Sequence, residues 1–418
     1  MSNNDFIYAL ISGLILILFA LSIKSLVRSY THPSVVYSFV WGCGLLLVAA
    51  AGNFGIFPVT SHTLLLYIFG AVMFSAGALT TSHLMKCRPN SREVFSELEV
   101  INFRSLSFCY LLLTMVVMPF IVLSILSHGD DIIEISYNLR VAALNDEPVL
   151  PSYLSYYYVL SLSLSLIVLY GVISGKVKLI YFFMLFLPFV ATMLLVNGRS
   201  GLVSLILSWF FAYFFLGGKL SIRVVVLFSV SMFLIIFLGA IFVSKVNIEN
   251  MTLIDIFFII FEHVLDYYIQ GVVLFDLYFN GKLDISENWD ALNTVCQVLS
   301  VFNLCQPLPQ HQDVALFGEG KLGNVYSIYF SMFPKYGMLG IVFFMSLYGA
   351  VAAFFYENAK RGFGFSYVIS CFIFSFIVLS LFSDGFGYSL ILFVQTLFFV
   401  YFTLFFFGKK FSFRKVLF

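Results

Sequence analysis

Apolar runs free of charged residues recur along the whole chain and restrict its fold more than any other feature. Each run is close to the roughly 20 residues that a helix needs to cross a bilayer. None has Asp, Glu, Lys or Arg in its interior, and charged residues make up only 10% of the 418 residues. An average soluble domain has about 25%. The pattern predicts an all-α polytopic membrane protein.

Eleven runs are predicted to be transmembrane helices. They cover residues 6–23, 35–51, 63–81, 105–127, 153–174, 179–196, 201–217, 224–244, 337–356, 365–382 and 387–407. The first run has no basic residues before it and no small-residue cleavage site, so we expect no cleaved signal peptide. The chain then divides into residues 1–244 with eight helices, a large loop over 245–336, and residues 337–418 with three helices and a tail.

The Lys and Arg residues are distributed unequally between the two sets of connections. Six of the 22 fall on one side, and they are Arg140, Arg199, Lys245, Lys282, Lys321 and Lys335. Cytoplasmic loops of membrane proteins are enriched in Lys and Arg, so the side with the other 16 is predicted to be the cytoplasm. The N-terminus and the 245–336 loop then lie outside, and the C-terminus lies inside.

The large external loop contains a stretch, residues 252–279, that is apolar enough to resemble another crossing. Its polar residues share one helical face, and they are Asp255, Glu262, Asp266 and Gln270. This pattern is typical of an amphipathic helix lying on a membrane surface. A crossing here would also reverse the charge bias of the following loops. We therefore expect the external loop to contain amphipathic helices.

Two arginines on the cation-poor side are candidates for anion binding. Arg199 lies in a tight turn, residues 197–201, with glycines on both sides of the Arg-Ser pair. Glycines permit close approach of a ligand, and a guanidinium suits phosphate oxygens. The alternative for Arg199 is an anchor that reaches lipid headgroups. Arg140 lies in an acidic loop, so an ion pair with a neighbouring carboxylate is its alternative.

The loop also holds a candidate base and a candidate disulfide. His311 is a candidate general base, with Asp313 as a substitute and a solvated surface histidine as the alternative reading. Cys296 and Cys305 lie nine residues apart on the predicted outer side, where oxidising conditions permit a disulfide. No His and Cys group has metal-ligand spacing, and no phosphate loop or dinucleotide fingerprint occurs, so we expect no metal and no cofactor.

Three features resemble the O-antigen and oligosaccharide repeat-unit polymerases of bacteria, the Wzy type. An arginine, Arg199, opens a span after the short outer turn 197–201. An Asn-x-Tyr-Ser stretch at 324–327 precedes a Lys-Tyr-Gly-x-x-Gly stretch at 335–340 that leads into a span. The layout of about eleven spans with one long external loop late in the chain is also similar.

The resemblance implies a metal-independent glycosyltransferase with a GT-C-like fold in the bacterial inner membrane, its active site facing the periplasm. It would polymerise undecaprenyl-diphosphate-linked oligosaccharides into a surface polysaccharide. Those substrates, the bilayer and a chain-length regulator protein are the implied partners, and nucleic acid is not. Arg140 and Arg199 would clamp the diphosphate, a leaving group whose developing charge needs cations, and His311 would be the base. The candidate substrate-binding residues are Asn197, Asn324, Tyr326, Lys321 and Lys335.

Two other functions fit parts of the pattern. An O-antigen ligase, which moves finished polymer onto lipid A core, shares the layout, and other lipid-linked glycosyltransferases belong to the same class. A flippase or transporter for lipid-linked oligosaccharides is the alternative outside enzymes. Transporters usually carry internal repeats and polar groups at mid-membrane, and the sequence shows neither.

Overall fold

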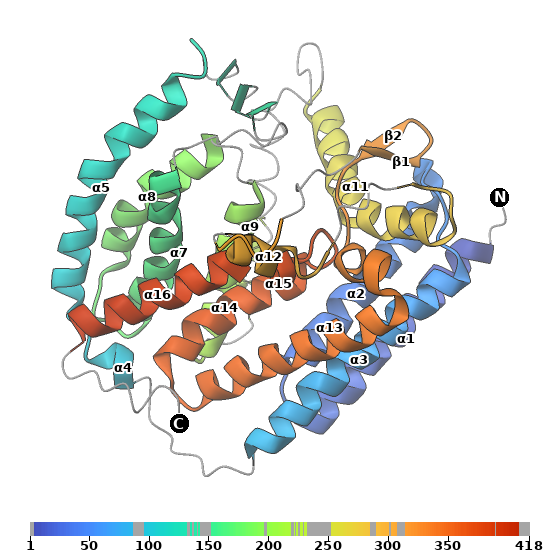
Figure 1. The fold of residues 1–418 in the computed structure, drawn as a ribbon, viewed down its shortest axis with the longest axis horizontal. Coiled ribbons are helices and arrows are strands. Elements are labelled where there is room, and N and C mark those ends of the chain that lie inside the picture. The colour runs from blue at the N-terminus through green and yellow to red at the C-terminus, as the bar shows by residue number, and fades with distance from the viewer. Residues whose placement is uncertain are drawn as a thin grey trace. The chain divides into compact units, whose positions relative to one another are not determined.

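The computed structural model is predominantly helical (Figure 1). It describes residues 4–86, 96–131, 134–135, 138–139, 141–142, 152–195, 199–218, 221, 223–224, 226–228, 230–231, 252–284, 290–300, 302–306, 314–388 and 390–408. The chain forms two compact units. Unit 1 comprises Met1–Pro89, Phe261–Glu357 and Phe376–Ile391, and unit 2 comprises Asn90–Ile260, Asn358–Ser375 and Leu392–Phe418. Each unit therefore gathers residues from several of the stretches into which the sequence divides the chain.

Over the described residues, the elements follow one another as helices with one small hairpin. Before the large loop they are α1 (Asn4–Val27), α2 (Pro33–Ala50), the 3-10 helix η1 (Ala51–Phe54), α3 (Ser61–Lys86), α4 (Ser96–Glu99), α5 (Phe103–Leu126), α7 (Ser152–Ile173), α8 (Leu179–Leu195) and α9 (Arg199–Phe215). From the loop onward they are α11 (Leu253–Phe279), α12 (Asn293–Ser300), β1 (Ala315–Gly318), β2 (Lys321–Gly323), α13 (Tyr329–Lys360), α14 (Gly364–Leu379), α15 (Gly385–Tyr388) and α16 (Leu390–Phe407).

The apolar helices confirm a membrane protein with several crossings. Within the described residues, six helices are long and apolar enough to span a bilayer, namely α1, α2, α3, α5, α7 and α13, and four shorter apolar helices are α8, α9, α14 and α16. These ten helices coincide with ten of the predicted spans. The remaining span, 224–244, lies largely outside the described residues. The count of eleven and the orientation stay predictions.

Aromatic side chains form the core of unit 1. Trp41 of α2, Tyr67 of α3 and Tyr329 of α13 lie with their ring centroids 5.0 Å apart in each pair. The polar atoms of these rings are satisfied inside the unit, because Trp41 donates to Ser380 Oγ at 2.9 Å and Tyr67 donates to the Val272 carbonyl at 2.8 Å. Buried aromatic rings with paired polar tips fix one packing arrangement.

Two glycines let α3 and α13 pack backbone against backbone. A Cβ at Gly77 of α3 would collide with the Ser346 carbonyl of α13, and a Cβ at Gly349 of α13 would collide with the Phe74 carbonyl of α3. Small residues at such crossings are the usual means of close helix packing in membranes. The contact fixes α13 to the N-terminal helices of unit 1.

Hydroxyl groups connect the helices of unit 2. Tyr110 of α5 donates to Ser161 of α7 at 2.8 Å, and Thr114 of α5 lies 3.1 Å from the Tyr157 hydroxyl of α7. Trp209 of α9 donates to Ser165 of α7 at 2.9 Å. Hydrogen bonds of this kind join transmembrane helices without burying charge.

The predicted amphipathic helix exists as α11, but its second half does not lie on a surface. The side chains from Ile269 to Asp276 are all buried. Phe275 packs against Tyr67 and Tyr329, and Gly271 lies against the backbone of Leu381 and Ser327. The expectation of a surface helix is therefore wrong for this half, because other elements of unit 1 cover it on every side.

Candidate functional site

A small hairpin in the large loop is bonded to a turn near the N-terminus, and both belong to unit 1. Strands β1 and β2 pair antiparallel, with Leu316 opposite Leu322. The hairpin then bonds to the turn that follows η1, since Phe57 N donates to the Phe317 carbonyl at 3.1 Å and Glu319 N donates to the Gly55 carbonyl at 2.7 Å. Two stretches predicted to be external and distant in sequence thus meet in one small backbone network.

The polar face of α11 contacts this hairpin. Lys321 of β2 donates to Glu262 at 2.7 Å and to Asp266 at 2.8 Å, and Gln270 lies against Gly323. Burial alone lowers the pKa of Lys321, but the hydrogen bonds and charges of Asp266 and Glu262 outweigh it and raise that pKa. The Lys321 side chain is only 14% exposed. Lys321 therefore neutralises two acids of the fold, and its role as a substrate ligand stays a prediction.

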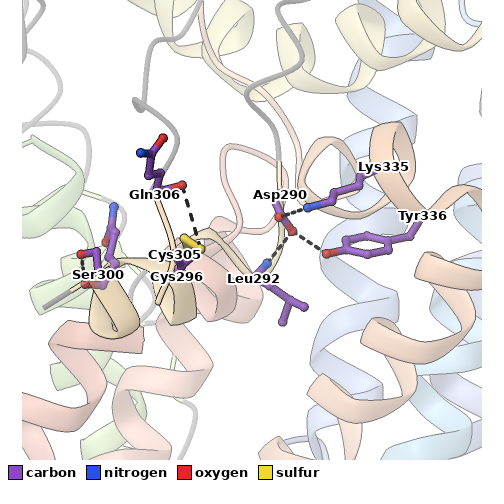
Figure 2. The surroundings of a disulfide bond; sticks show 9 residues. Asp290, Leu292, Cys296, Ser300, Cys305, Gln306, Lys335 and Tyr336 are labelled. Carbon is purple, nitrogen blue, oxygen red and sulfur yellow. Dashed lines mark hydrogen bonds and ion pairs between the residues drawn. A yellow bond between two sulfur atoms is a disulfide. The ribbon is translucent and has the colours of Figure 1, made fainter. Parts of the chain in front are cut away.

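A second charged cluster surrounds Asp290 and is drawn in Figure 2. Its carboxylate pairs with the Lys335 ammonium and accepts hydrogen bonds from the Tyr336 hydroxyl at 2.7 Å and from the Leu292 amide at 2.8 Å. Burial acts to raise the pKa of Asp290, but the Lys335, Leu292 and Tyr336 donors lower it overall. The Asp290 side chain is 10% exposed, whereas that of Lys335 is 54% exposed. Lys335 therefore keeps half of its surface available to a ligand.

The disulfide lies beside this cluster. Cys296 of α12 is bonded to Cys305, with Cα atoms 5.4 Å apart, and Figure 2 shows the bond between α12 and the non-helical segment that follows it. Asp290 stands three residues before α12 begins. The disulfide and the Asp290 cluster thus secure both ends of one short segment.

Asp384 and Asp276 are two other buried carboxylates of unit 1. Asp384 accepts hydrogen bonds from Ser331 Oγ at 2.6 Å, Tyr348 OH at 3.1 Å, and the amides of Phe386 and Gly387 at 3.0 and 2.9 Å. Burial raises the pKa of Asp384 in opposition to these donors. The carboxylate caps the four-residue helix α15 and ties it to α13, which is a structural role.

Asp276 joins α11 to the turn before α3. Its Oδ1 accepts the Thr60 amide at 2.9 Å, the Thr60 hydroxyl at 2.6 Å and the Asn280 amide group at 3.0 Å. The carboxylate therefore fixes the N-terminal end of α3, where backbone amides have no helical partner.

The arginines and the histidine predicted to act in catalysis cannot be compared with these clusters. Arg199 is the first residue of α9, and its side chain lies outside the described residues, as do Asn197, Arg140 and His311. Of the other predicted ligands, Asn324 is half-buried, and Tyr326 is 1% exposed and packs on Phe330 at 4.6 Å. Tyr326 therefore belongs to the core and is not supported as a substrate contact.

Sequence reasoning missed Asp276, Asp290 and Asp384 as members of polar clusters. The signal for Asp276 was its spacing of four residues from Asn280 on one helical face. Asp384 lies between the predicted spans 365–382 and 387–407, and its side-chain partners Ser331 and Tyr348 come from α13, which no local pattern indicates. Among the described residues, no group of three or more His, Cys, Asp or Glu side chains could hold a metal ion.

Comparison with known proteins adds no family to this picture. No family model, no curated protein and no solved structure matches the chain.

Proposed function

We propose that this membrane protein is a glycosyltransferase of the O-antigen polymerase type, with a GT-C-like fold, which joins lipid-linked oligosaccharides outside the membrane. One observation carries the proposal. Lys335, half exposed and held by Asp290, stands in α13 just before the exposed apolar residues Met338 and Leu339. The diphosphate of a membrane-bound carrier lies at the boundary between a polar loop and a lipid-facing helix. Lys335 places a cation at that boundary.

The disulfide supports the external location of this site. Disulfides persist in oxidising compartments such as the periplasm, and the Cys296–Cys305 bond lies beside Asp290. The free cysteines of the described residues, Cys43, Cys109 and Cys371, lie in the apolar helices α2, α5 and α14.

The reaction sets the requirements on the site. An acceptor hydroxyl attacks the anomeric carbon, its proton passes to a base, and the bond from that carbon to the diphosphate oxygen breaks with its electron pair. Cations placed where that negative charge develops stabilise the transition state. Because Lys321 is neutralised by Glu262 and Asp266, this task falls to Arg140, Arg199 and Lys335. His311 remains the proposed base.

The first test separates polymerase from ligase. Purified protein in lipid nanodiscs receives undecaprenyl-diphosphate-linked repeat units and no lipid A acceptor, and products are resolved by length. A ladder of lipid-linked polymer supports a polymerase. Product formed only after lipid A core is added assigns a ligase, and no transfer with either acceptor contradicts the proposal.

The second test addresses the proposed clamp. Replacing Arg199 by alanine should slow polymer formation about 100-fold or more, the usual loss when a charge-stabilising donor is removed. The matched control is Arg223→Ala, because Arg223 is exposed on the predicted cytoplasmic side and should keep the rate unchanged. Equal rates for Arg199→Ala and the parent protein would remove Arg199 from the mechanism.

A further inference from the structure

The segment between Asp290 and the disulfide exposes a group of large apolar side chains, here named the α12 wedge. Its exposed large side chains are Leu292, Val295, Val298, Leu299, Phe302 and Leu304. Within α12, Val295, Val298 and Leu299 are spaced by three and four residues and so share one helical face. No charged residue occurs from position 291 to 306. Contiguous exposed apolar patches mark interaction sites.

The backbone conformation after α12 leaves the tip of the wedge, residues 302–304, exposed. Leu304 N donates to the Leu299 carbonyl at 3.2 Å and Asn303 N donates to the Ser300 carbonyl at 2.9 Å, which is a Schellman motif at the end of α12. Asn303 has φ of 56°, a left-handed conformation that Asn tolerates better than most residues. The two neighbours, Phe302 and Leu304, are 69% and 71% exposed.

Two constraints prevent this surface from turning inward. The disulfide joins Cys296 in the helix to Cys305 just after the tip, and Asp290 before the helix is bound to Lys335 and Tyr336. An apolar tip that is braced at both ends in an exposed position is not a collapsed loop. We expect such an exposed apolar surface to contact another apolar surface.

The Asp290 cluster indicates what covers it. Lys335 and Tyr336 lie directly before the part of α13 whose apolar side chains are exposed, beginning with Met338 at 46% and Leu339 at 80%. The wedge is therefore fastened to α13 at the level where that helix is predicted to enter the bilayer. We propose that the α12 wedge inserts into the outer leaflet at the boundary between headgroups and acyl chains. The apolar face of an interfacial amphipathic helix is buried about 5–10 Å into this boundary.

The proposal goes beyond the proposed function and does not depend on it. It is tested with the full-length protein in nanodiscs of phosphatidylcholine brominated near the glycerol end of the acyl chains. The variant Phe302→Trp adds an indole at the tip, and its emission is taken relative to the parent protein in the same discs. The control is Lys282→Trp, since Lys282 is an exposed charged residue in the turn after α11. Both variants must retain the disulfide by mass spectrometry.

We expect the indole at position 302 to lose most of its added emission in brominated lipid and to resist iodide, a water-soluble quencher. The indole at position 282 should show the opposite behaviour. Quenching of position 302 by iodide and not by bromine would place the tip in water and overturn the proposal. Protection from both quenchers would mean that protein covers the tip, and this too would overturn it. A second variant, Leu304→Trp, repeats the measurement in case Phe302→Trp does not fold.

Discussion

At the scale of single residues, charge pairing decides which polar side chains remain available. Lys321 is enclosed by two carboxylates, whereas Lys335 shares one carboxylate with a tyrosine and keeps half its surface exposed. A cation that is already neutralised and mostly buried has little net charge and little exposed surface with which to bind an anionic ligand. The two lysines look alike in sequence and differ only in their surroundings.

Tyr336→Phe should destabilise the protein by about 1.5–3 kcal/mol, the usual worth of a hydrogen bond to a charged group. The phenol donates to the Asp290 carboxylate at 2.7 Å, and Phe keeps the ring while removing only that donor. Unfolding in detergent, followed by loss of the native near-ultraviolet circular dichroism, measures the change. A shift no larger than that of Leu339→Ala, which alters an 80% exposed neighbour, would show that the bond contributes nothing.

The same cluster should make stability depend on pH in a defined direction. The pKa of Asp290 is lowered in the folded protein, so its contribution is complete well above the ordinary Asp value of 3.8 and is lost as the pH falls through the folded value. The difference in unfolding temperature between the parent and Asp290→Asn should be largest near neutral pH and shrink below pH 3.8. A difference that grows on acidification would contradict this assignment.

Lys321→Met should destabilise unit 1 because it removes the ammonium that donates to both Glu262 and Asp266. The loss should fall below the roughly 3–5 kcal/mol of a fully buried pair, since Glu262 is 46% exposed. The control is Lys282→Met, which removes an exposed cation from the same loop. If Lys321→Met instead kept full stability and lost transfer activity, Lys321 would be a ligand of the substrate after all.

At the scale of elements, local sequence predicts where the helices end. It does not predict which of their residues are buried. The predicted spans 105–127 and 365–382 correspond to α5 and α14, which end within three residues of those bounds. Helix α13 begins at Tyr329 and is broken at Gly337, the residue where the span 337–356 was predicted to start. The turns before this break were not part of the predicted span, and Tyr329 and Phe330 in them pack against Phe275 of α11. Packing partners from another part of the chain cannot be read from a hydrophobic run.

The candidate site shows the same division. The pairing of Cys296 with Cys305 and the shared polar face of α11 are both local patterns, and the structure contains each of them. Asp290 and Lys335 are 45 residues apart. No spacing rule joins them, because only the folded loop brings the two side chains together.

The backbone conformation of Gly337 in α13 restricts which residues can occupy this position. It breaks α13 with φ of 57° and ψ of −147°, a region that is essentially confined to glycine. Nothing lies within 4 Å of a Cβ built there, so space is not the constraint. Gly337→Ala should cost about 1–3 kcal/mol through backbone strain, measured by unfolding in detergent. An effect equal to that of Leu339→Ala would show that α13 straightens at no cost.

At the scale of the whole molecule, the charge distribution predicts how the chain lies in the membrane. Alkaline phosphatase fused after Asp284, in the loop beyond α11, should be active, because this enzyme folds only outside the cytoplasm. Green fluorescent protein fused after Gly408 should fluoresce, since the C-terminus is predicted to be inside. The opposite pair of results would invert the orientation and place the Asp290 cluster in the cytoplasm.

The contact between α3 and α13 has a consequence for how this chain can diverge over evolutionary time. Most large side chains that face lipid can be exchanged for others of similar polarity, because the bilayer accepts any shape. At Gly77 and Gly349 the neighbour is a carbonyl of the other helix, and a larger residue at either position drives the two helices apart. Homologues too distant to recognise by their apolar residues should still have glycine, whose side chain is a single hydrogen atom, at these two positions.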